Sequence, residues 1–258
     1  MSTRRTGTLR AAVAAEARKA RSARVLWSTG VLLVVGVAVL AGVMVAAARS
    51  GNAEVAAKLG PTAAAGDWPA LLGVAAQVTA AGGLLAFGVG ISWLTGREFA
   101  DRTVSGLFGL PVGRGTIAAA KMLVYAGWAL AASLALTALL PLVGLLVGIG
   151  LPSVADLIGL SRQFALGVLT ALIAVPAGWA ASIGRGLLPG IATAVGILVV
   201  AQVSVVAGVG GWVPFVAPAA WAIHPDGPTS LALLLVPAVP LVFGVATLLA
   251  WRRLQLDR

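Results

Sequence analysis

The chain has 258 residues, of which 60% are hydrophobic and only 10% carry a charge. A soluble domain usually has about 25% charged residues, so this chain has too few polar side chains to cover a surface that faces water. It has no cysteine and a single histidine, His224, which excludes disulfides, thiolate catalysis and metal sites built from these residues. The net charge of +10 comes from basic residues that flank apolar runs, so anionic lipid headgroups are expected as partners and nucleic acid is not.

Six apolar runs are long enough to cross a bilayer, which takes about 20 residues in a helix. They predict an all-α integral membrane protein, with 1–258 as a single transmembrane domain and no soluble domain beside it. The least distinct boundary is Gly184-Arg185-Gly186, which we interpret as a tight turn between the fourth and fifth helices. The predicted spans are about 25–48, 70–95, 118–148, 163–184, 187–209 and 230–251.

The distribution of basic residues predicts that both termini are cytoplasmic. In that orientation 15 of the 18 lysines and arginines lie on the cytoplasmic side, and only Arg49, Lys58 and Arg162 lie on the external side. A cleaved signal peptide is the alternative reading of the first run. That run has about 24 residues, however, which is longer than the apolar core of a signal peptide.

The chemistry that the sequence lacks also narrows its function. The centres of the predicted spans contain no Asp, Glu, Lys, Arg or His, which disfavours ion-coupled transport but leaves Na⁺ coordination by backbone carbonyls open. The close acidic pair Glu98 and Asp101 has arginine neighbours, which favour a structural network over acid–base catalysis. No lysine stands in the motif that binds ATP phosphates. We therefore predict that the chain is not an enzyme and that any uphill transport draws its energy from another chain.

Two basic segments outside the spans are informative. The first, residues 1–24, is interpreted from position 9 onward as an amphipathic helix on the inner headgroup surface; a basic flank that only fixes topology is the alternative. Its apolar positions are Leu9, Val13, Ala17 and Ala20, and its basic positions include Arg10, Arg18, Lys19 and Arg21.

The second segment is the loop 96–114, between the second and third spans. Glu98 and Arg102 stand four residues apart, a spacing that allows an ion pair along a short helix. Charges beside apolar groups in a compact loop favour docking to a soluble partner, and an ordinary positive-inside loop is the alternative. The apolar side is formed by Leu107, Phe108 and Leu110, and Pro111 ends the turn.

The order Glu98, Thr103, Leu107, Pro111, Arg114 and Lys121 resembles the same loop of bacterial type-2 ABC exporter permeases. The basic N-terminal helix, the six spans and a Pro-rich segment at 211–225, similar to the external cap of that family, extend the resemblance along the chain. Two positions depart from the pattern: Arg102 stands where Gly is common, and Gly113 replaces a frequent Ser.

The resemblance implies a permease subunit of an ATP-binding cassette exporter in the cell inner or plasma membrane. Its partners would be a second permease, identical or homologous, two copies of an ATPase subunit, and membrane lipids. ATP and Mg would bind the ATPase, and this chain would hold no cofactor or metal. The charge-free spans suggest an amphipathic or hydrophobic cargo, such as a drug, a peptide antibiotic or a lipid-like molecule.

The resemblance also implies that the loop is a coupling helix seated on the ATPase, with the basic helix leaning on the same assembly. The implied docking residues are Glu98, Asp101, Arg102, Thr103, Leu107, Phe108, Pro111 and Arg114, and those of the basic helix are Arg18, Lys19 and Arg21.

Three other functions are alternatives: an ATP-independent carrier or channel, a membrane-embedded enzyme such as a lipid transferase, and a scaffold or immunity protein that does not transport. Two smaller expectations concern the spans. Gly82, Gly83, Gly88 and Gly90 should permit close helix packing. Trp212 and Trp221 suit the headgroup level, where His224 would be a solvated side chain.

Overall fold

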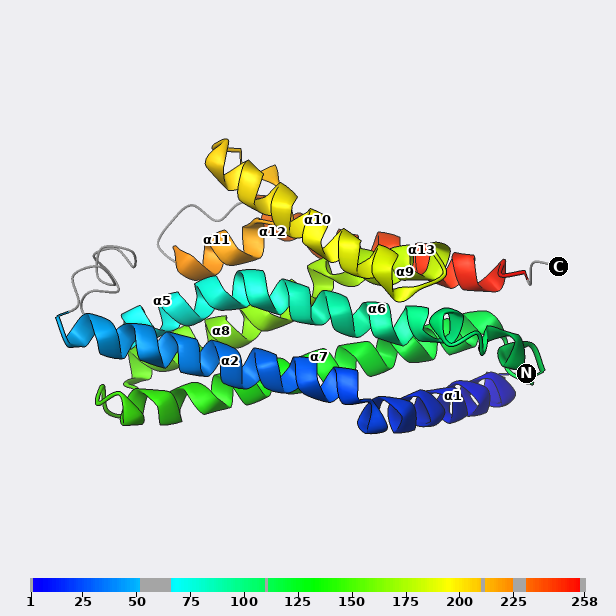
Figure 1. Ribbon diagram of the computed structural model, residues 1–258, viewed down its shortest axis with the longest axis horizontal. Coiled ribbons are helices and arrows are strands. Elements are labelled where there is room, and N and C mark those ends of the chain that lie inside the picture. The colour runs from blue at the N-terminus through cyan, green and yellow to red at the C-terminus, as the bar shows by residue number, and fades with distance from the viewer. Residues whose placement is uncertain (1, 52–65, 110, 210–211, 225–230, 256–258) are drawn as a thin grey trace.

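The computed structural model describes residues 2–51, 66–109, 111–209, 212–224 and 231–255, which form helices and no strand (Figure 1). Six helical segments in this part of the chain are long and apolar enough to cross a membrane, as predicted. They are Arg24–Arg49 (α2), Trp68–Ala100 (α5, Trp68–Val78; η1, Thr79–Gly83; α6, Leu84–Ala100), Arg114–Leu146 (α7), Val154–Ile183 (α8, Val154–Ile173; α9, Val175–Ile183), Leu187–Val206 (α10) and Ala232–Arg252 (most of α12, Leu231–Leu235, and α13, Ala238–Arg252).

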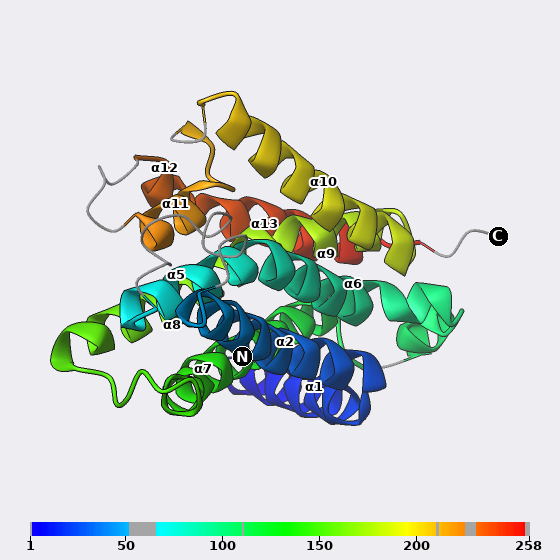
Figure 2. The same ribbon diagram turned by 60° about the vertical axis from the view of Figure 1, so that its left-hand side comes forward.

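The long helices run side by side in two groups that α6 joins (Figures 1 and 2). In one group α2 packs on α5 and α7, and α7 packs on α8; in the other α9 packs on α10 and α13. α6 contacts α2 and α7 as well as α9 and α10. The outer surfaces remain apolar: Leu32 is 72% exposed and Val203 is 62% exposed. Lipid is the solvent that suits such a surface.

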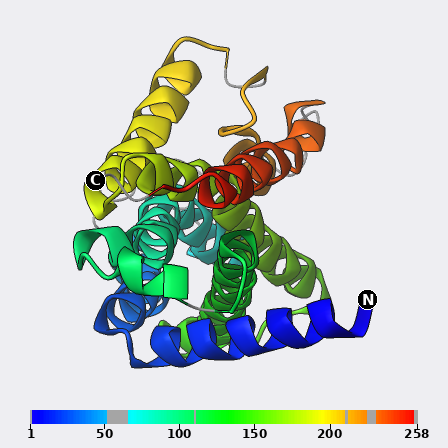
Figure 3. The same cartoon turned by 90° about the vertical axis from the view of Figure 1, so that its right-hand side faces the viewer.

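One end of the bundle gathers most of the basic side chains, and it is termed the basic end. It carries the α6–α7 loop at 101–113, the α9–α10 turn at 184–186 and the C-terminal end of α13 (Figure 1). α1, Ser2–Ser22, lies across this end, where the spans are viewed nearly end-on (Figure 3). The 3-10 helix η2, Val104–Gly109, forms the middle of the α6–α7 loop.

The tight turn between the fourth and fifth spans is confirmed. α9 ends at Ile183 and α10 begins at Leu187. Between them Arg185 adopts a left-handed backbone conformation with φ of 51°, and the amide of Gly186 donates to the carbonyl of Ala181 at 3.0 Å. This is the hydrogen bond with which a left-handed residue commonly ends a helix.

The start of the fourth span was predicted too late. Its helix begins at Val154 rather than 163 because Ser153 and Asp156 form a capping box that satisfies the first amides. Arg162 therefore lies within α8 and not in a loop, with its guanidinium carbon 5.8 Å from the ring centre of Trp221.

The Pro-rich segment that resembles an external cap lies partly outside the described residues. Its described part contains α11, Ala217–Ile223, which packs on α5 and α8 away from the basic end (Figure 1). Trp212 is 78% exposed, Trp221 is half-buried in α11, and the exposed His224 follows that helix.

Close helix packing is confirmed at three of the four predicted glycines. A Cβ atom on Gly88 would lie 2.4 Å from Cβ of Ala194 on α10, and one on Gly90 would lie 2.5 Å from the ring of Trp128 on α7. Gly83 is also buried, and a Cβ atom on it would contact Leu33 of α2 and Thr170 of α8, each at 3.6 Å. Gly82 faces open space, since a Cβ atom on it would meet no neighbouring atom within 4 Å.

Replacing Gly88 with leucine should therefore separate α6 from α10. We expect Gly88→Leu to lower the free energy of unfolding by about 1–3 kcal/mol, the usual cost of overpacking. Gly82→Leu is the matched control in the same span and should be near neutral. Denaturant unfolding in detergent micelles measures both, and equal losses would contradict the packing.

Candidate functional site

Four charged side chains meet inside the basic end and are termed the charge cluster: Glu16 and Lys19 of α1, Glu98 of α6 and Lys121 of α7. The Lys121 Nζ donates to Glu98 Oε1 at 2.6 Å and to Glu16 Oε2 at 2.9 Å. The Lys19 Nζ donates to Glu16 Oε1 at 2.7 Å and to Glu98 Oε1 at 3.3 Å. Two ammonium groups balance two carboxylates, so the cluster joins three helices without a net charge.

The local structure explains why these residues meet. Glu98 lies in the last turn of α6, and Lys121 lies two turns into α7, so the loop between the two helices brings them to a similar depth. Glu16 and Lys19 are three residues apart, which places them on one face of α1. Because α1 lies across the basic end (Figure 3), that face packs on α7, and its Lys19 reaches Glu98 of α6.

Burial makes the pairing necessary. The side chain of Lys121 is only 1% exposed, and those of Glu16 and Glu98 are 5% and 7% exposed. An unpaired charge at such positions would cost several kcal/mol, whereas a paired and hydrogen-bonded one is tolerated. Glu98 uses Oε1 for both lysines, and its buried Oε2 has no hydrogen-bond partner among the described residues.

Trp251 extends the cluster to two more helices. The Lys121 Nζ lies 5.5 Å from the centre of the Trp251 ring, within the range of a cation–π contact. The indole Nε1 of Trp251, which is in α13, donates to Oγ of Ser182 in α9 at 3.0 Å. The charge cluster is therefore the point at which α1, α6, α7, α9 and α13 are joined.

The two members on α1 have shifted pKa values. Burial alone would raise the pKa of Glu16, but Lys121 and Lys19 outweigh it and hold that pKa below its ordinary value. Burial alone would lower the pKa of Lys19, but Glu16 and Glu98 outweigh it and raise that pKa. Both shifts favour the charged forms, so α1 stays paired to the bundle near neutral pH.

The loop at 101–113 begins with a strained helix end. The amide of Thr103 donates to the carbonyl of Glu98 at 2.9 Å, and that of Arg102 donates to Phe99 at 3.2 Å. These two bonds form a Schellman motif, whose left-handed position is usually glycine. Here Arg102 occupies it with φ of 57°.

Within η2, neighbouring apolar side chains point in different directions. Leu107 is buried in a small core with Ile117, Ala118 and Trp251. Phe108 is 37% exposed, and the guanidinium carbon of Arg114 lies 4.7 Å from its ring centre. The loop is therefore anchored by one apolar residue and presents the next one outward.

The C-terminal end of α13 also fixes the loop. Arg114 donates from its guanidinium to the carbonyl of Leu254. This bond connects the start of α7 to the residues that follow α13.

The predicted ion pair between Glu98 and Arg102 is wrong. Glu98 faces the interior and pairs with the lysines of α1 and α7, because a buried carboxylate needs partners of opposite charge. The exposed pair along this helix is instead Arg97 with Asp101, at 3.0 Å. Of the other predicted docking residues, Leu107 is buried and Arg114 is half-buried. The remaining ones are exposed: Asp101, Arg102, Thr103, Phe108 and Pro111. Leu110, predicted on the apolar side of the loop, lies outside the described residues.

From Thr8 onward, the most buried positions of α1 are Ala12 and Glu16, and the predicted apolar residues flank them, half-buried. Arg18 and Arg21 are exposed, and Lys19 is drawn into the charge cluster. Sequence reasoning missed Glu16 and the internal role of Lys121. The available signals were an isolated acidic residue in a basic helix and a lysine at the start of an apolar run.

Deeper in the bundle the polar groups are uncharged. Gln163 of α8 donates from Nε2 to Oγ1 of Thr79, the first residue of the π-helical segment η1, at 2.8 Å. No group of three His, Cys, Asp or Glu side chains that could hold a metal ion occurs within the described ranges. Within the described residues, the buried charged side chains therefore lie at the basic end.

A bundle of membrane-length helices, with a loop anchored to its charged end, defines a multi-pass helical membrane protein. The sequence matches the family described as "ABC-2 family transporter protein" over residues 12–202, which include α1 from Ala12 onward, the charge cluster and the loop. The chain belongs to this family, whose members are membrane subunits of ABC transporters. No curated protein and no solved structure matches the chain significantly.

Removing the central lysine should leave two buried carboxylates that share a single ammonium group, that of Lys19. We expect Lys121→Met to lower the free energy of unfolding by about 3–5 kcal/mol, as for other broken buried ion pairs. Adding Glu98→Gln to Lys121→Met should restore part of the loss, because it removes the carboxylate charge that Lys19 alone does not balance.

The control for this prediction is Asp101→Asn, which breaks the exposed pair with Arg97 and should cost less than about 1 kcal/mol. Denaturant unfolding in detergent compares the three variants. If Lys121→Met costs no more than Asp101→Asn, the charge cluster does not hold the basic end together.

The pKa shifts predict how this stability depends on pH. The pKa of Glu16 is lower in the folded state, so its contribution is complete above its unfolded pKa and is lost as the pH falls through the folded pKa. The pKa of Lys19 is raised, so its contribution is complete below its unfolded pKa and is lost as the pH rises through the folded pKa. The difference in melting temperature between wild type and Glu16→Gln should therefore shrink towards acid pH, and that for Lys19→Gln towards strongly alkaline pH. Differences that stay constant with pH would contradict the assignment.

Proposed function

We propose that this chain is the permease subunit of an ABC exporter that uses ATP hydrolysed by a separate ATPase subunit. The observation that carries the proposal is the loop 101–113, which is exposed on one side and anchored to the charge cluster on the other. Force applied to such a loop reaches several spans at once. Membership of the ABC-2 family supports a transport role.

The exposed residues of the loop form the docking surface in this proposal. Phe108 supplies an apolar contact with the guanidinium of Arg114 over its ring, and Asp101 and Arg102 supply charges of both signs. Exposed aromatic and arginine side chains are the residue types that dominate protein interfaces. Glu98 and Leu107, which are buried, would position this surface rather than contact the ATPase.

The path of a movement follows from the contacts. Leu107 packs with Trp251 of α13, and the Trp251 ring faces Lys121 of α7. Lys121 binds Glu98 of α6 and Glu16 of α1. Nucleotide-driven closure of two ATPase copies would thus move α1, α6, α7 and α13 together, and a second permease would complete the translocation pathway.

The proposed orientation places the basic end in the cytoplasm of a cell that exports an amphipathic or hydrophobic cargo. The positive-inside rule supports this orientation. The absence of ionisable side chains from the predicted span centres supports the nature of the cargo, since a strongly charged substrate would find no partner there.

Phe108→Ala tests the docking surface. We expect it to reduce ATPase-driven transport in proteoliposomes by roughly tenfold, which corresponds to about 1.4 kcal/mol of lost contact energy. Folding should be unaffected, because the ring lies on the exposed side of the loop. The matched control is Trp212→Ala, which removes an aromatic side chain 78% exposed and distant in sequence from the loop.

The experiment requires co-purification of the chain with its ATPase. Unchanged coupling in Phe108→Ala would contradict the role of the loop, and transport by the isolated chain without any ATPase would contradict the exporter proposal itself.

A further inference from the structure

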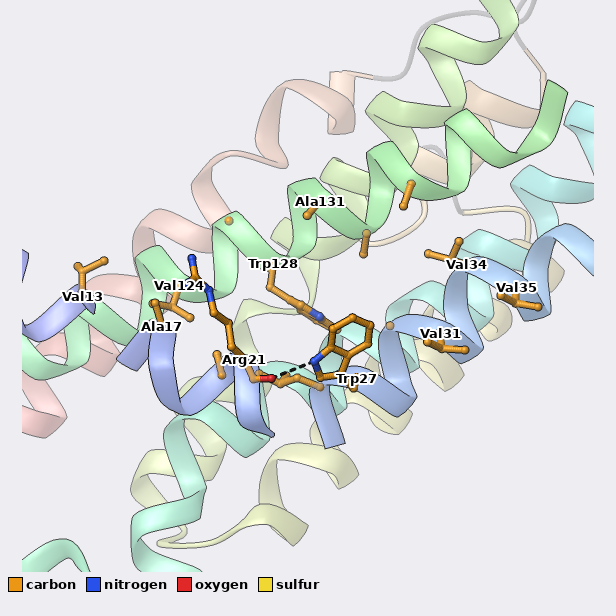
Figure 4. A pocket seen from close by; sticks show the side chains of 16 residues that line it. Val13, Ala17, Arg21, Trp27, Val31, Val34, Val35, Val124, Trp128 and Ala131 are labelled. Atoms are coloured by element: carbon orange, nitrogen blue, oxygen red, sulfur yellow. Dashed lines mark hydrogen bonds between the residues drawn. The ribbon is translucent and has the colours of Figure 1, made fainter. Parts of the chain in front are cut away.

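An apolar groove with a volume of about 730 Å³ runs along the outside of the bundle between α1, α2 and α7 (Figure 4). Val31 and Val34 of α2 form one wall, and Val124 and Ala131 of α7 form the other. Gly127 on α7 deepens it, because a Cβ atom on this residue would meet no neighbouring atom within 4 Å. An apolar groove of this size on a membrane-spanning surface faces hydrocarbon and needs an apolar occupant.

The length of the groove matches one leaflet. On α2 its lining extends from Leu26 to Val35, which is a rise of about 14 Å along a helix. The hydrocarbon core of a bilayer is about 30 Å thick, so the groove covers about half of it. It begins at the α1–α2 junction, at the basic end, and therefore lies in the leaflet on that side.

The mouth of the groove is positively charged. Arg21 of α1 lines it, and its side chain points towards Val124 of α7 (Figure 4). No carboxylate in the described parts of the chain forms an ion pair with Arg21. Trp27 closes this end of the groove by donating from Nε1 to the carbonyl of Arg21 at 2.9 Å. A cation and an indole above an apolar channel are the groups expected at the level of lipid headgroups.

We propose that this groove binds a phospholipid with an anionic headgroup, whose acyl chain fills the apolar channel and whose phosphate contacts Arg21. The proposal does not depend on ATP coupling, because no residue of the α6–α7 loop lines the groove. A lipid in this position touches α1, α2 and α7 together and supports α1 through residues other than those of the charge cluster.

A second copy of the chain fits this face less well. A two-fold contact would bring the same patch of both copies together. The exposed side of α1 carries Arg10, Arg18 and Arg21, so such a contact would oppose like charges along its edge. An anionic lipid neutralises that edge, which favours it as the occupant.

Two pairs of variants test the two halves of the site. Gly127→Leu adds a side chain in the channel, and Gly196→Leu adds the same side chain to α10. At both positions a Cβ atom would meet no neighbouring atom within 4 Å. Arg21→Gln removes the charge at the mouth, and Arg18→Gln removes an exposed charge of α1 that does not line the groove.

Native mass spectrometry of the full chain, released from nanodiscs of phosphatidylglycerol or phosphatidylcholine with identical acyl chains, counts the retained lipids. We expect wild type, Gly196→Leu and Arg18→Gln to retain one phosphatidylglycerol per chain more strongly than phosphatidylcholine. In Arg21→Gln the preference for phosphatidylglycerol over phosphatidylcholine should fall by roughly fivefold, as expected for the loss of one basic residue at a membrane surface. Gly127→Leu should lose retention of both lipids.

Two results would overturn the proposal. The first is equal retention of phosphatidylglycerol by Gly127→Leu and Gly196→Leu. The second is a dimer of the wild type that Gly127→Leu converts to a monomer without any change in bound lipid, which would assign the groove to a second copy. Loss of ATP-driven transport in Phe108→Ala has no bearing on either result.

Discussion

The structure of the basic end depends on one constraint: the ammonium group of Lys121 is buried and has to be paired. Its side chain is 1% exposed at the end of an apolar bundle, where an isolated charge is not tolerated. Satisfying it requires Glu98 from the same hairpin and Glu16 from a helix more than a hundred residues away in sequence. α1 therefore lies across the bundle because the cluster needs its carboxylate, and Lys19 then balances the charge.

Because of this constraint, the exposed loop is connected to the spans through packed and hydrogen-bonded residues. A flexible positive-inside loop would absorb a displacement, whereas this one is held in its middle and at its C-terminal end. Leu107 sits in a core with Trp251, and Arg114 donates to the carbonyl of Leu254. Buried polar networks have few alternative arrangements that keep all partners satisfied. In the proposed exporter, a displaced loop would therefore move whole helices and would not simply deform.

The apolar pattern predicted the architecture well, because the length and hydropathy of the spans are set by the bilayer itself. The turn at Arg185 was also predictable, since one continuous helix would be too long to cross once. The charge cluster was not predictable, because its pairs join residues 23 and 105 positions apart, and the four-residue rule that suggested Glu98 with Arg102 considers one helix alone. The missed start of α8 has a local cause: its capping box begins a helix whose first nine residues include two charged ones, Asp156 and Arg162.

Arg102, which the sequence marked as a departure from the loop it resembles, has a left-handed backbone conformation. A Schellman motif needs a positive φ at this position, which favours glycine and costs other residues about 1–2 kcal/mol. In this chain Gly148 and Gly208 occupy such positions at the ends of α7 and α10, whereas the positive-φ residues between α6 and α7 and between α9 and α10 are Arg102 and Arg185. Both arginines line one hollow with Ser105 and Gln255. Arg102 and Arg185 thus occupy strained positions that would suit glycine. Their guanidinium groups lie beside the proposed docking surface and carry a charge that glycine could not supply.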